Sequence, residues 1–385
     1  CVSAQLGQPL PDRVLVGYWH NWRSATTVNL QAVPPEYDVV NIAFATPTVP
    51  GGATMQFTPD AGIYATRQAF IADVRKLQAQ GKKVLISIGG ANDPVHVKSA
   101  ADAASFASSM QQIITTHGFD GLDIDLEGAS LSLDAGDIDF RSPRSPRIVH
   151  FIAAVKSLMA SLPPGAILTA APETAFVQGG YSAYAGIWGA YLPVLHALRY
   201  QLTYVHVQHY NTGSMFGLDG KIYVSSTPDF HVAMAEMLLH GFKVSGSNAI
   251  FPPLRPDQVA LGLPASLSAA GSGYTPPGMV QQALDYLYLG KPFGGKYVLA
   301  RAGGYPDFRG LMTWSINWDL VNRREFALNH APYLRSVFLR ADAATFSATT
   351  GGTVNFALRG GRGHAQRYHY LAAGLSGTTP GTSLP

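Results

Sequence analysis

The chain has 385 residues, of which 47% are hydrophobic and 13% charged, so it has the apolar material for a large core and not the composition of a disordered protein. The net charge is only +3 and the basic residues are dispersed, which excludes the charge pattern of a nucleic-acid-binding protein. No uninterrupted apolar run reaches the roughly 18 residues of a membrane span. We therefore expect a globular protein with no nucleic-acid partner and no membrane span.

Short apolar runs alternate with helical patterns along most of the chain. Strands are predicted at 13–18, 37–45, 83–88, 119–126, 166–171, 202–209, 258–263 and 309–315. Helices are predicted at 61–80, 100–116, 147–162, 182–199, 228–240, 277–289 and 321–336. The strands are short and rich in Val, Ile, Leu and Ala, as is typical of parallel strands covered on both faces. Eight strands that alternate with helices predict an α/β fold, a (β/α)8 TIM barrel over residues 13–336.

Both ends of the chain depart from this pattern. Residues 1–12 are interpreted as the remnant of an N-terminal leader, because the chain opens with Cys1 and not with Met. Cys1 is then a processing or cloning boundary or, alternatively, a lipid-modified cysteine, and a single cysteine allows no intrachain disulfide. Residues 337–385 alternate small polar and apolar residues before a Gly/Thr/Pro run. They predict a short β-rich extension, either a tail or the start of a truncated accessory module with a linker.

The fourth predicted strand concentrates acidic residues in an apolar setting. Asp123, Asp125 and Glu127 alternate with apolar residues, so they share one face of the strand, and that face points into a barrel. Like charges in a low dielectric repel, so at least one of these carboxyl groups is expected to hold a proton at neutral pH. Glu127 lies at the C-terminal end of the strand, where barrel active sites lie. The pattern predicts Glu127 as a general acid with Asp125 as its hydrogen-bond partner.

A metal site and a solvated charged strand are the alternatives to catalytic use of these acids. A metal site would more usually bring His ligands or acids from several strands. A solvated strand would not separate its acids with Ile and Leu residues. Catalytic use therefore fits the pattern best.

Residues 120–127, Asp-Gly-Leu-Asp-Ile-Asp-Leu-Glu, resemble the DxxDxDxE signature of glycoside hydrolase family 18, the chitinases and their relatives. Other resemblances follow in the expected order: Ser87-Ile88-Gly89-Gly90 to the SxGG motif, Gln208-His209-Tyr210-Asn211 to a bacterial QxYN motif, and Trp314 to the tryptophan after the eighth strand. The resemblance extends over about residues 13–336. It independently implies the barrel that the alternation of strands and helices predicts.

The resemblance implies a chitinase that cleaves β-1,4 links between N-acetylglucosamine units of chitin and chitooligosaccharides with retention. In this family the acetamido oxygen of the substrate attacks the anomeric carbon and forms an oxazolinium ion. Glu127 would be the acid and then the base, Asp125 would orient the acetamido group, and Asp123 would be a buried charge partner. Tyr210 would donate its hydroxyl to the acetamido oxygen. No cofactor and no metal are expected.

The remaining candidate site residues are assigned to substrate binding by the same resemblance. They are Tyr18, Ser87, Gly89, Gly90, Gln208, Asn211 and Trp314. Trp314 would form the apolar floor under a sugar, and Gln208 would help to position the acetamido group. Ser87 either packs beneath the acids or donates a hydrogen bond to Asp123. Asn211 stands where many relatives carry Asp.

Other aromatic residues have two possible placements. Trp19, Trp22, Trp188 and Trp318 are candidates for either a sugar groove or the core. His209 alternates with Gln208 and Tyr210, so it is expected to face the core or a helix instead of the site.

Two other functions share parts of this pattern. An endo-β-N-acetylglucosaminidase acting on N-glycans has the same acid motif. A chitin-binding lectin on the same barrel would lack the catalytic acid, whereas this chain has Glu127 at that position. Only about 13 residues separate the seventh strand from its helix, too few for an inserted domain, so we expect an open groove and endo cleavage. We expect a monomeric protein secreted by a bacterium to the extracellular space.

Overall fold

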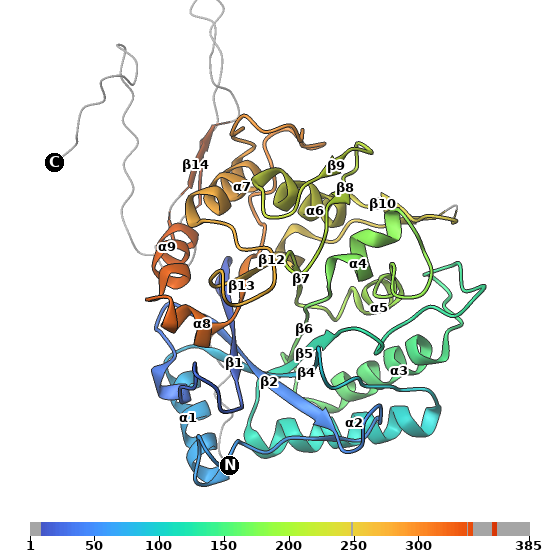
Figure 1. The fold of residues 1–385 in the computed structure, drawn as a ribbon, viewed down its shortest axis with the longest axis vertical. Helices are drawn as coiled ribbons and strands as arrows, with labels where there is room; N and C mark the ends of the chain where they lie inside the picture. Colours follow the sequence, from blue (N-terminus) through green and yellow to red (C-terminus); the bar gives the residue numbers. More distant parts are fainter. Residues whose placement is uncertain (1–8, 248, 337, 342–355, 360–385) are drawn as a thin grey trace, which may run out of the picture. The chain divides into compact units, whose positions relative to one another are not determined.

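The computed structural model describes residues 9–247, 249–336, 338–341 and 356–359. The chain divides into two compact units, residues 1–334 and 335–385. In the first unit eight parallel strands close into a barrel, with helices around it (Figure 1). These strands are β1 (Val14–His20), β2 (Val39–Pro47), β4 (Lys83–Gly90), β5 (Gly121–Leu126), β6 (Ile167–Ala170), β7 (Tyr204–Gln208), β12 (Val259–Pro264) and β13 (Gly310–Trp314). The predicted (β/α)8 barrel is confirmed.

The strands follow one another around the barrel in chain order. Each pairs in parallel with the next, and β1 closes the ring by pairing with both β2 and β13. Alternate residues point inward, and the apolar ones form the inner core: Val14, Val16, Tyr18, Val39, Ala43, Leu85, Ile167, Ala171, Tyr204 and Met312. On β5, Asp123 pairs in register with Ser87 of β4 and Thr169 of β6. The register therefore brings polar side chains together above the apolar layer.

The helices begin and end at residues suited to those positions. Their bounds are α1 (Arg67–Ala79), α2 (Ala100–His117), α3 (Pro146–Ser161), α4 (Thr174–Val177), α5 (Leu192–Leu198), α6 (Pro228–His240), α7 (Pro277–Leu289), α8 (Ile316–Val321) and α9 (Glu325–Leu334). Thr66, Ser99 and Thr227 cap α1, α2 and α6 by accepting a backbone N–H through the side-chain oxygen. Gly118 ends α2 in a left-handed conformation, with a φ of 71°.

Two predicted helices differ from the observed ones for local backbone reasons. The helix expected over 182–199 forms only as α5, because Gly186 and Gly189 have φ values of 57° and 77°. The helix expected over 321–336 is replaced by α8 and α9. Arg323 and Arg324, with φ values of 57° and 62°, lie in the break between them.

Short elements decorate the barrel. They are β3 (Met55–Gln56) paired antiparallel with β2, the pairs β8 (Met215–Phe216) with β9 (Ile222–Tyr223) and β10 (Phe242–Lys243) with β11 (Ile250–Phe251), and the 3-10 turns η1 (Leu30–Ala32), η2 (Gln178–Tyr181) and η3 (Pro256–Gln258). Between β12 and α7, residues 265–276 form a loop without a regular helix or strand.

In the second unit β14 (Phe338–Ala341) pairs antiparallel with β15 (Phe356–Arg359). Most of the predicted tail and the first eight residues of the predicted leader lie outside the described residues. Over the described part of the chain, no helix is both long and apolar enough to cross a membrane.

Candidate active site

Asp123 lies inside the barrel, where hydroxyl groups from the two neighbouring strands β4 and β6 and from the more distant β1 surround it. Tyr18 Oη and Ser87 Oγ donate hydrogen bonds of 2.5 and 2.7 Å to Asp123 Oδ2, and Thr169 Oγ1 donates one of 2.6 Å to Oδ1. His206 Nε2 lies 3.2 Å from Oδ1, at ion-pair distance but without hydrogen-bond alignment. Asp123 has no exposed surface, so its carboxylate depends on these partners.

These partners determine the charge of Asp123. Burial alone would raise its pKa, but the imidazole of His206 and the hydroxyls of Thr169 and Tyr18 outweigh burial and hold the pKa of Asp123 below its usual value. Asp123 is therefore a carboxylate at neutral pH. It places a fixed negative charge beneath the two acids that follow it on the same face of β5.

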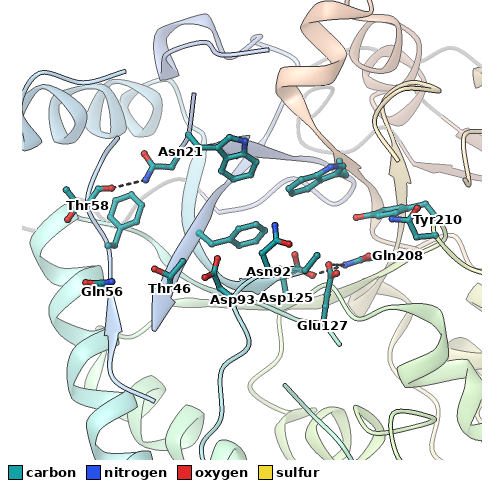
Figure 2. A pocket seen from close by; sticks show the side chains of 18 residues that line it. Asn21, Thr46, Gln56, Thr58, Asn92, Asp93, Asp125, Glu127, Gln208 and Tyr210 are labelled. Carbon is teal, nitrogen blue, oxygen red and sulfur yellow. Dashed lines mark hydrogen bonds between the residues drawn. The ribbon is translucent and has the colours of Figure 1, made fainter. Parts of the chain in front are cut away.

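Asp125 and Glu127 form a coupled pair at the C-terminal end of β5. Gln208 Nε2 donates to Asp125 Oδ1 at 2.8 Å and to Glu127 Oε1 at 2.9 Å, so a single amide touches both carboxyl groups (Figure 2). The two carboxyl groups also share a hydrogen bond. The same Gln208 nitrogen is anchored to the Ala171 carbonyl at 3.0 Å.

The pair retains a proton at a pH where isolated carboxyl groups have lost theirs. Burial raises the pKa of Asp125, and the negative charges of Glu127 and Asp123 raise it further. Burial also raises the pKa of Glu127, against the hydrogen bonds from Gln208 and Asp125. The proton that the sequence predicts among the crowded acids thus agrees with the pKa directions, with Asp123 as the ionised member.

Gly89 and Gly90 allow the backbone of β4 to approach this pair. A Cβ on Gly89 would lie 2.3 Å from the Asp125 carbonyl oxygen, and one on Gly90 would lie 2.7 Å from the Phe44 ring. Both glycines have positive φ, 97° and 75°, which disfavours any other residue there. Their contribution is close approach of the backbone at the edge of the cavity.

A cavity of about 670 Å³ opens over Asp125 and Glu127. Its walls are Asn21, Trp22, Phe44, Thr46, Gln56, Phe57, Thr58, Gly89, Gly90, Ala91, Asn92, Asp93, Asp125, Glu127, Gln208, Tyr210, Asn211 and Trp314 (Figure 2). The structure thus brings eight of the eleven predicted site residues to one cavity. The other three, Tyr18, Ser87 and Asp123, lie beneath it and are not among its walls. Tyr18 and Ser87 contact Asp123 instead of the cavity, which points to positioning and away from the predicted substrate contact.

Aromatic rings form one side of the cavity. The Trp314 ring stacks with Phe44, with centroids 6.0 Å apart and planes 14° apart, and Phe44 stacks in turn with Trp22 at 6.3 Å and 16°. The His20 ring stacks on Trp22, with ring centroids 4.3 Å apart. Of the tryptophans with two possible placements, Trp22 lines the cavity and Trp19 is a core residue. Trp188 and Trp318 are not among the residues that line it.

Tyr210 follows β7 and enters the same cavity from the side of Gln208. It is 6% exposed, and burial, followed by the charges of Asp125 and Glu127, raises the pKa of its hydroxyl well above the usual value. The hydroxyl therefore remains a hydrogen-bond donor at any working pH. Asn211 also lines the cavity, but its Oδ1 accepts the Gly271 N–H at 2.9 Å, so part of its capacity is used within the protein.

Several residues of the site are not identified by the sequence alone. Thr169 and His206 complete the surroundings of Asp123, and Phe44, Asn92 and Asp93 line the cavity. Phe44 lies near the end of a predicted barrel strand, which is where aromatic site residues could have been sought. Asn92 and Asp93 follow the predicted Gly-Gly turn, and nothing in their spacing distinguishes them.

Within the described residues, no group of three or more His, Cys, Asp and Glu side chains is arranged to hold a metal ion. A closed parallel barrel with coupled carboxyl groups at the C-terminal end of one strand defines a barrel hydrolase of the acid–base type. The chain belongs to the glycosyl hydrolases family 18, whose family model matches residues 14–291.

Comparisons with individual proteins agree with this family. The chain is 54% identical over 331 residues to "Chitinase Chi52" of Paenibacillus xylanexedens and 54% identical over 332 residues to "Chitinase D" of Niallia circulans. Each match covers 86% of this chain but 63% of the relative, so the chain spans less than two thirds of these relatives. The solved structure of a family GH18 chitinase from Chromobacterium violaceum matches with a TM-score of 0.77 and 38% identity, covering 85% of each chain.

Proposed function

We propose that this chain is a chitinase that hydrolyses β-1,4 links between N-acetylglucosamine units with retention of configuration. The observation that carries the proposal is the coupled pair Asp125–Glu127, bridged by Gln208 in a cavity whose side is a stack of aromatic rings. The similarity to two relatives named as chitinases supports the substrate.

Glu127 is proposed as the general acid. It directly follows the C-terminal residue of β5, it lines the cavity, and its raised pKa keeps a proton available for the leaving oxygen. After the aglycone leaves, the Glu127 carboxylate takes a proton from the water that completes hydrolysis. The proton taken from water replaces the one that Glu127 gave to the leaving oxygen, so the Asp125–Glu127 pair is returned to its starting protonation state.

The nucleophile in this proposal is the acetamido oxygen of the substrate. In a double displacement by two protein carboxyl groups, the second faces the sugar from the side opposite the acid. Here Asp125 lies beside Glu127 on the same face of β5 and is hydrogen bonded to it. This arrangement suits Asp125 to hold the acetamido N–H, while Tyr210 donates to the acetamido oxygen.

The sugar in the reactive subsite is proposed to stack on Trp314. Apolar C–H faces of a pyranose pack well on aromatic rings, and the stacked Phe44 and Trp22 extend the apolar surface for neighbouring units. Asn21, Gln56 and Thr58 lie at the far end of the same cavity in Figure 2, where their polar groups suit sugar hydroxyls. We further propose endo action, because the short 265–276 loop inserts no extra domain that would deepen the groove. We also propose that the enzyme is extracellular and monomeric.

The proposal is tested by incubating the purified chain with chitohexaose and following the products by chromatography, in parallel with an N-glycosylated protein as substrate. Release of dimers, trimers and tetramers without glycan release is expected. Glycan release without chitohexaose cleavage would favour an endo-β-N-acetylglucosaminidase. Tight chitohexaose binding with no cleavage of either substrate would indicate a lectin.

A further inference from the structure

A buried chain of hydrogen bonds lies behind Tyr210, outside the cavity. His209 Nδ1 is 3.2 Å from His231 Nδ1 on α6, and the two imidazole rings are stacked with planes 3° apart. His231 Nε2 is 2.9 Å from Thr275 Oγ1, and Thr275 Oγ1 donates to the Gly273 carbonyl at 3.2 Å. His209 and His231 are 1% and 0% exposed, so no bulk water completes these contacts.

Only one assignment of donors and acceptors satisfies all three hydrogen bonds between His209, His231, Thr275 and Gly273. Thr275 has a single hydroxyl proton, and Gly273 accepts it, so Thr275 Oγ1 must accept from His231 Nε2–H. A neutral His231 protonated at Nε2 has an acceptor at Nδ1, so His209 donates through Nδ1–H. Both rings are neutral, since burial lowers the pKa of His209 well below its usual value and that of His231 to about 3.

The far end of the chain touches the backbone of Tyr210. A Cβ on Gly273 would lie 2.4 Å from Tyr210 Cα, so the loop packs directly on the residue, and Gly273 has a φ of 100°. The same loop holds Asn211, through Gly271 N–H to Asn211 Oδ1 at 2.9 Å. His231 therefore joins His209, the residue before Tyr210, to the 265–276 loop, and Asn211, the residue after Tyr210, binds the same loop directly.

We propose that His231 is a positioning residue for Tyr210: by accepting from His209 and donating to Thr275, it fixes the backbone on which the Tyr210 hydroxyl is aimed. This inference rests on the proposed function, in which Tyr210 contacts the acetamido oxygen. His231 itself reaches neither the cavity nor the carboxyl pair. It acts on the reaction only through the placement of Tyr210.

The first test compares His231→Phe with Tyr210→Phe and the double variant on chitohexaose. Phe fills the same buried space but makes neither hydrogen bond. We expect His231→Phe to lower kcat by roughly tenfold or more and to leave KM within about twofold. The Tyr210 hydroxyl would be misplaced, whereas the surfaces that bind the substrate would be unchanged. In the Tyr210→Phe background the same substitution is expected to cost less than about twofold, since the group being aimed is already gone.

A matched control is His330→Phe. His330 is also a buried histidine on an outer helix, 1% exposed, but neither of its ring nitrogens has a hydrogen-bond partner among the residues that the structure describes. It is expected to leave kcat within about twofold in both backgrounds. Thr275→Val should reproduce the kcat loss of His231→Phe, and Thr275→Ser, which keeps the hydroxyl, should restore wild-type turnover.

The second test needs no activity and uses the wild-type protein. Nitrogen-15 NMR of the histidine side chains is expected to show His209 protonated at Nδ1 and His231 at Nε2, with neither ring titrating between pH 5 and 9. The opposite tautomers would overturn the proposal, as would equal kcat losses for His231→Phe in both backgrounds. If His231→Phe does not fold, the kcat of Thr275→Val and the tautomers observed by NMR test the proposal instead. A wild-type chain that cleaves no chitohexaose would refute the proposed function, a result distinct from either.

Discussion

Asp123 and Asp125 lie two residues apart on the same face of β5, and their pKa values are displaced in opposite directions. Asp123 is held low by hydrogen bonds and His206, whereas Asp125 is raised by burial and by the negative charges on either side of it. The lower carboxylate thus adds to burial and to the charge of Glu127 in raising the pKa of the upper carboxyl group. In the proposed mechanism, this difference keeps available in the site the proton that Glu127 would deliver to a leaving group.

Glu127→Gln tests the assignment of the general acid. The amide preserves the shape and the contact with Gln208 but cannot donate a proton to the leaving oxygen, so kcat should fall at least ~10²-fold. Binding of chitohexaose, followed by quenching of tryptophan fluorescence, should be retained. Glu173→Gln is the matched control. Glu173 is a half-buried neighbour with a raised pKa that does not line the cavity, and its substitution should change kcat far less. A Glu127→Gln variant with a tenth of wild-type turnover would refute the assignment.

Asp123→Asn tests the electrostatic relation between the two aspartates. Removing the negative charge beneath Asp125 removes one of the causes that raise its pKa, so the pair should lose its proton at lower pH. The basic limb of the kcat profile is therefore expected to move to lower pH. Ser87→Ala, which deletes a hydrogen bond to Asp123 and leaves the charge, should move that limb much less. A basic limb that stays in place or moves upward in Asp123→Asn would contradict this relation.

Asp125→Asn should stabilise the fold while it impairs the reaction. A carboxyl group whose pKa is raised on folding contributes no penalty below its unfolded pKa of about 3.9 and an increasing penalty as the pH rises toward the folded value. Asn does not titrate, so the Tm advantage of the variant should be small near pH 4 and larger near pH 8. Each unit of pKa elevation corresponds to about 1.4 kcal/mol. Calorimetry from pH 4 to pH 8 measures the Tm difference between the variant and the wild type. A variant whose Tm falls further below that of the wild type as the pH rises would show that the ionisation of Asp125 does not destabilise the fold.

Trp314→Ala tests the aromatic floor. Loss of the ring removes the stacking surface and uncovers Phe44, so KM should rise and kcat/KM should fall at least tenfold, about 1.4 kcal/mol. Trp188→Ala provides the control, because Trp188 is 39% exposed and is not among the residues that line the cavity. Equal effects of the two substitutions on kcat/KM for chitohexaose would argue against a sugar site on Trp314.

Tyr210→Phe removes one hydroxyl without changing the shape of the cavity. If that hydroxyl acts mainly as charge develops on the acetamido oxygen, the loss should appear in kcat and amount to about 2–4 kcal/mol. KM should change little. Steady-state kinetics on chitohexaose measures both constants, and turnover within twofold of wild type would make Tyr210 a packing residue.

The sequence is informative where local geometry alone determines position. Alternation along one strand places Asp123, Asp125 and Glu127 on one face, and alternation along another predicts that His209 faces the core or a helix. In the structure His209 lies against His231 of α6. Contacts made by barrel closure are harder to foresee. The hydrogen bonds of Thr169 and Gln208 depend on the register between β5, β6 and β7, which no local pattern encodes.

Other features could not be predicted from the sequence because they depend on the backbone conformation of particular residues. The helix predicted over 182–199 is wrong over most of its length because apolar periodicity does not register two glycines with positive φ. Phe44 has the pattern of an ordinary strand residue, and its role in the aromatic stack depends on its position beside Trp314 after the ring closes.

The stereochemistry of the first product tests the central claim most directly. Proton NMR of chitohexaose cleavage, recorded before mutarotation, reports the anomer formed at the new reducing end. Attack by the acetamido oxygen followed by water inverts the anomeric carbon twice, so the initial product should be the β-anomer, and bonds with a deacetylated unit at the reactive position should resist cleavage. An initial α-anomer, or cleavage at deacetylated units, would contradict substrate-assisted catalysis by Asp125 and Glu127.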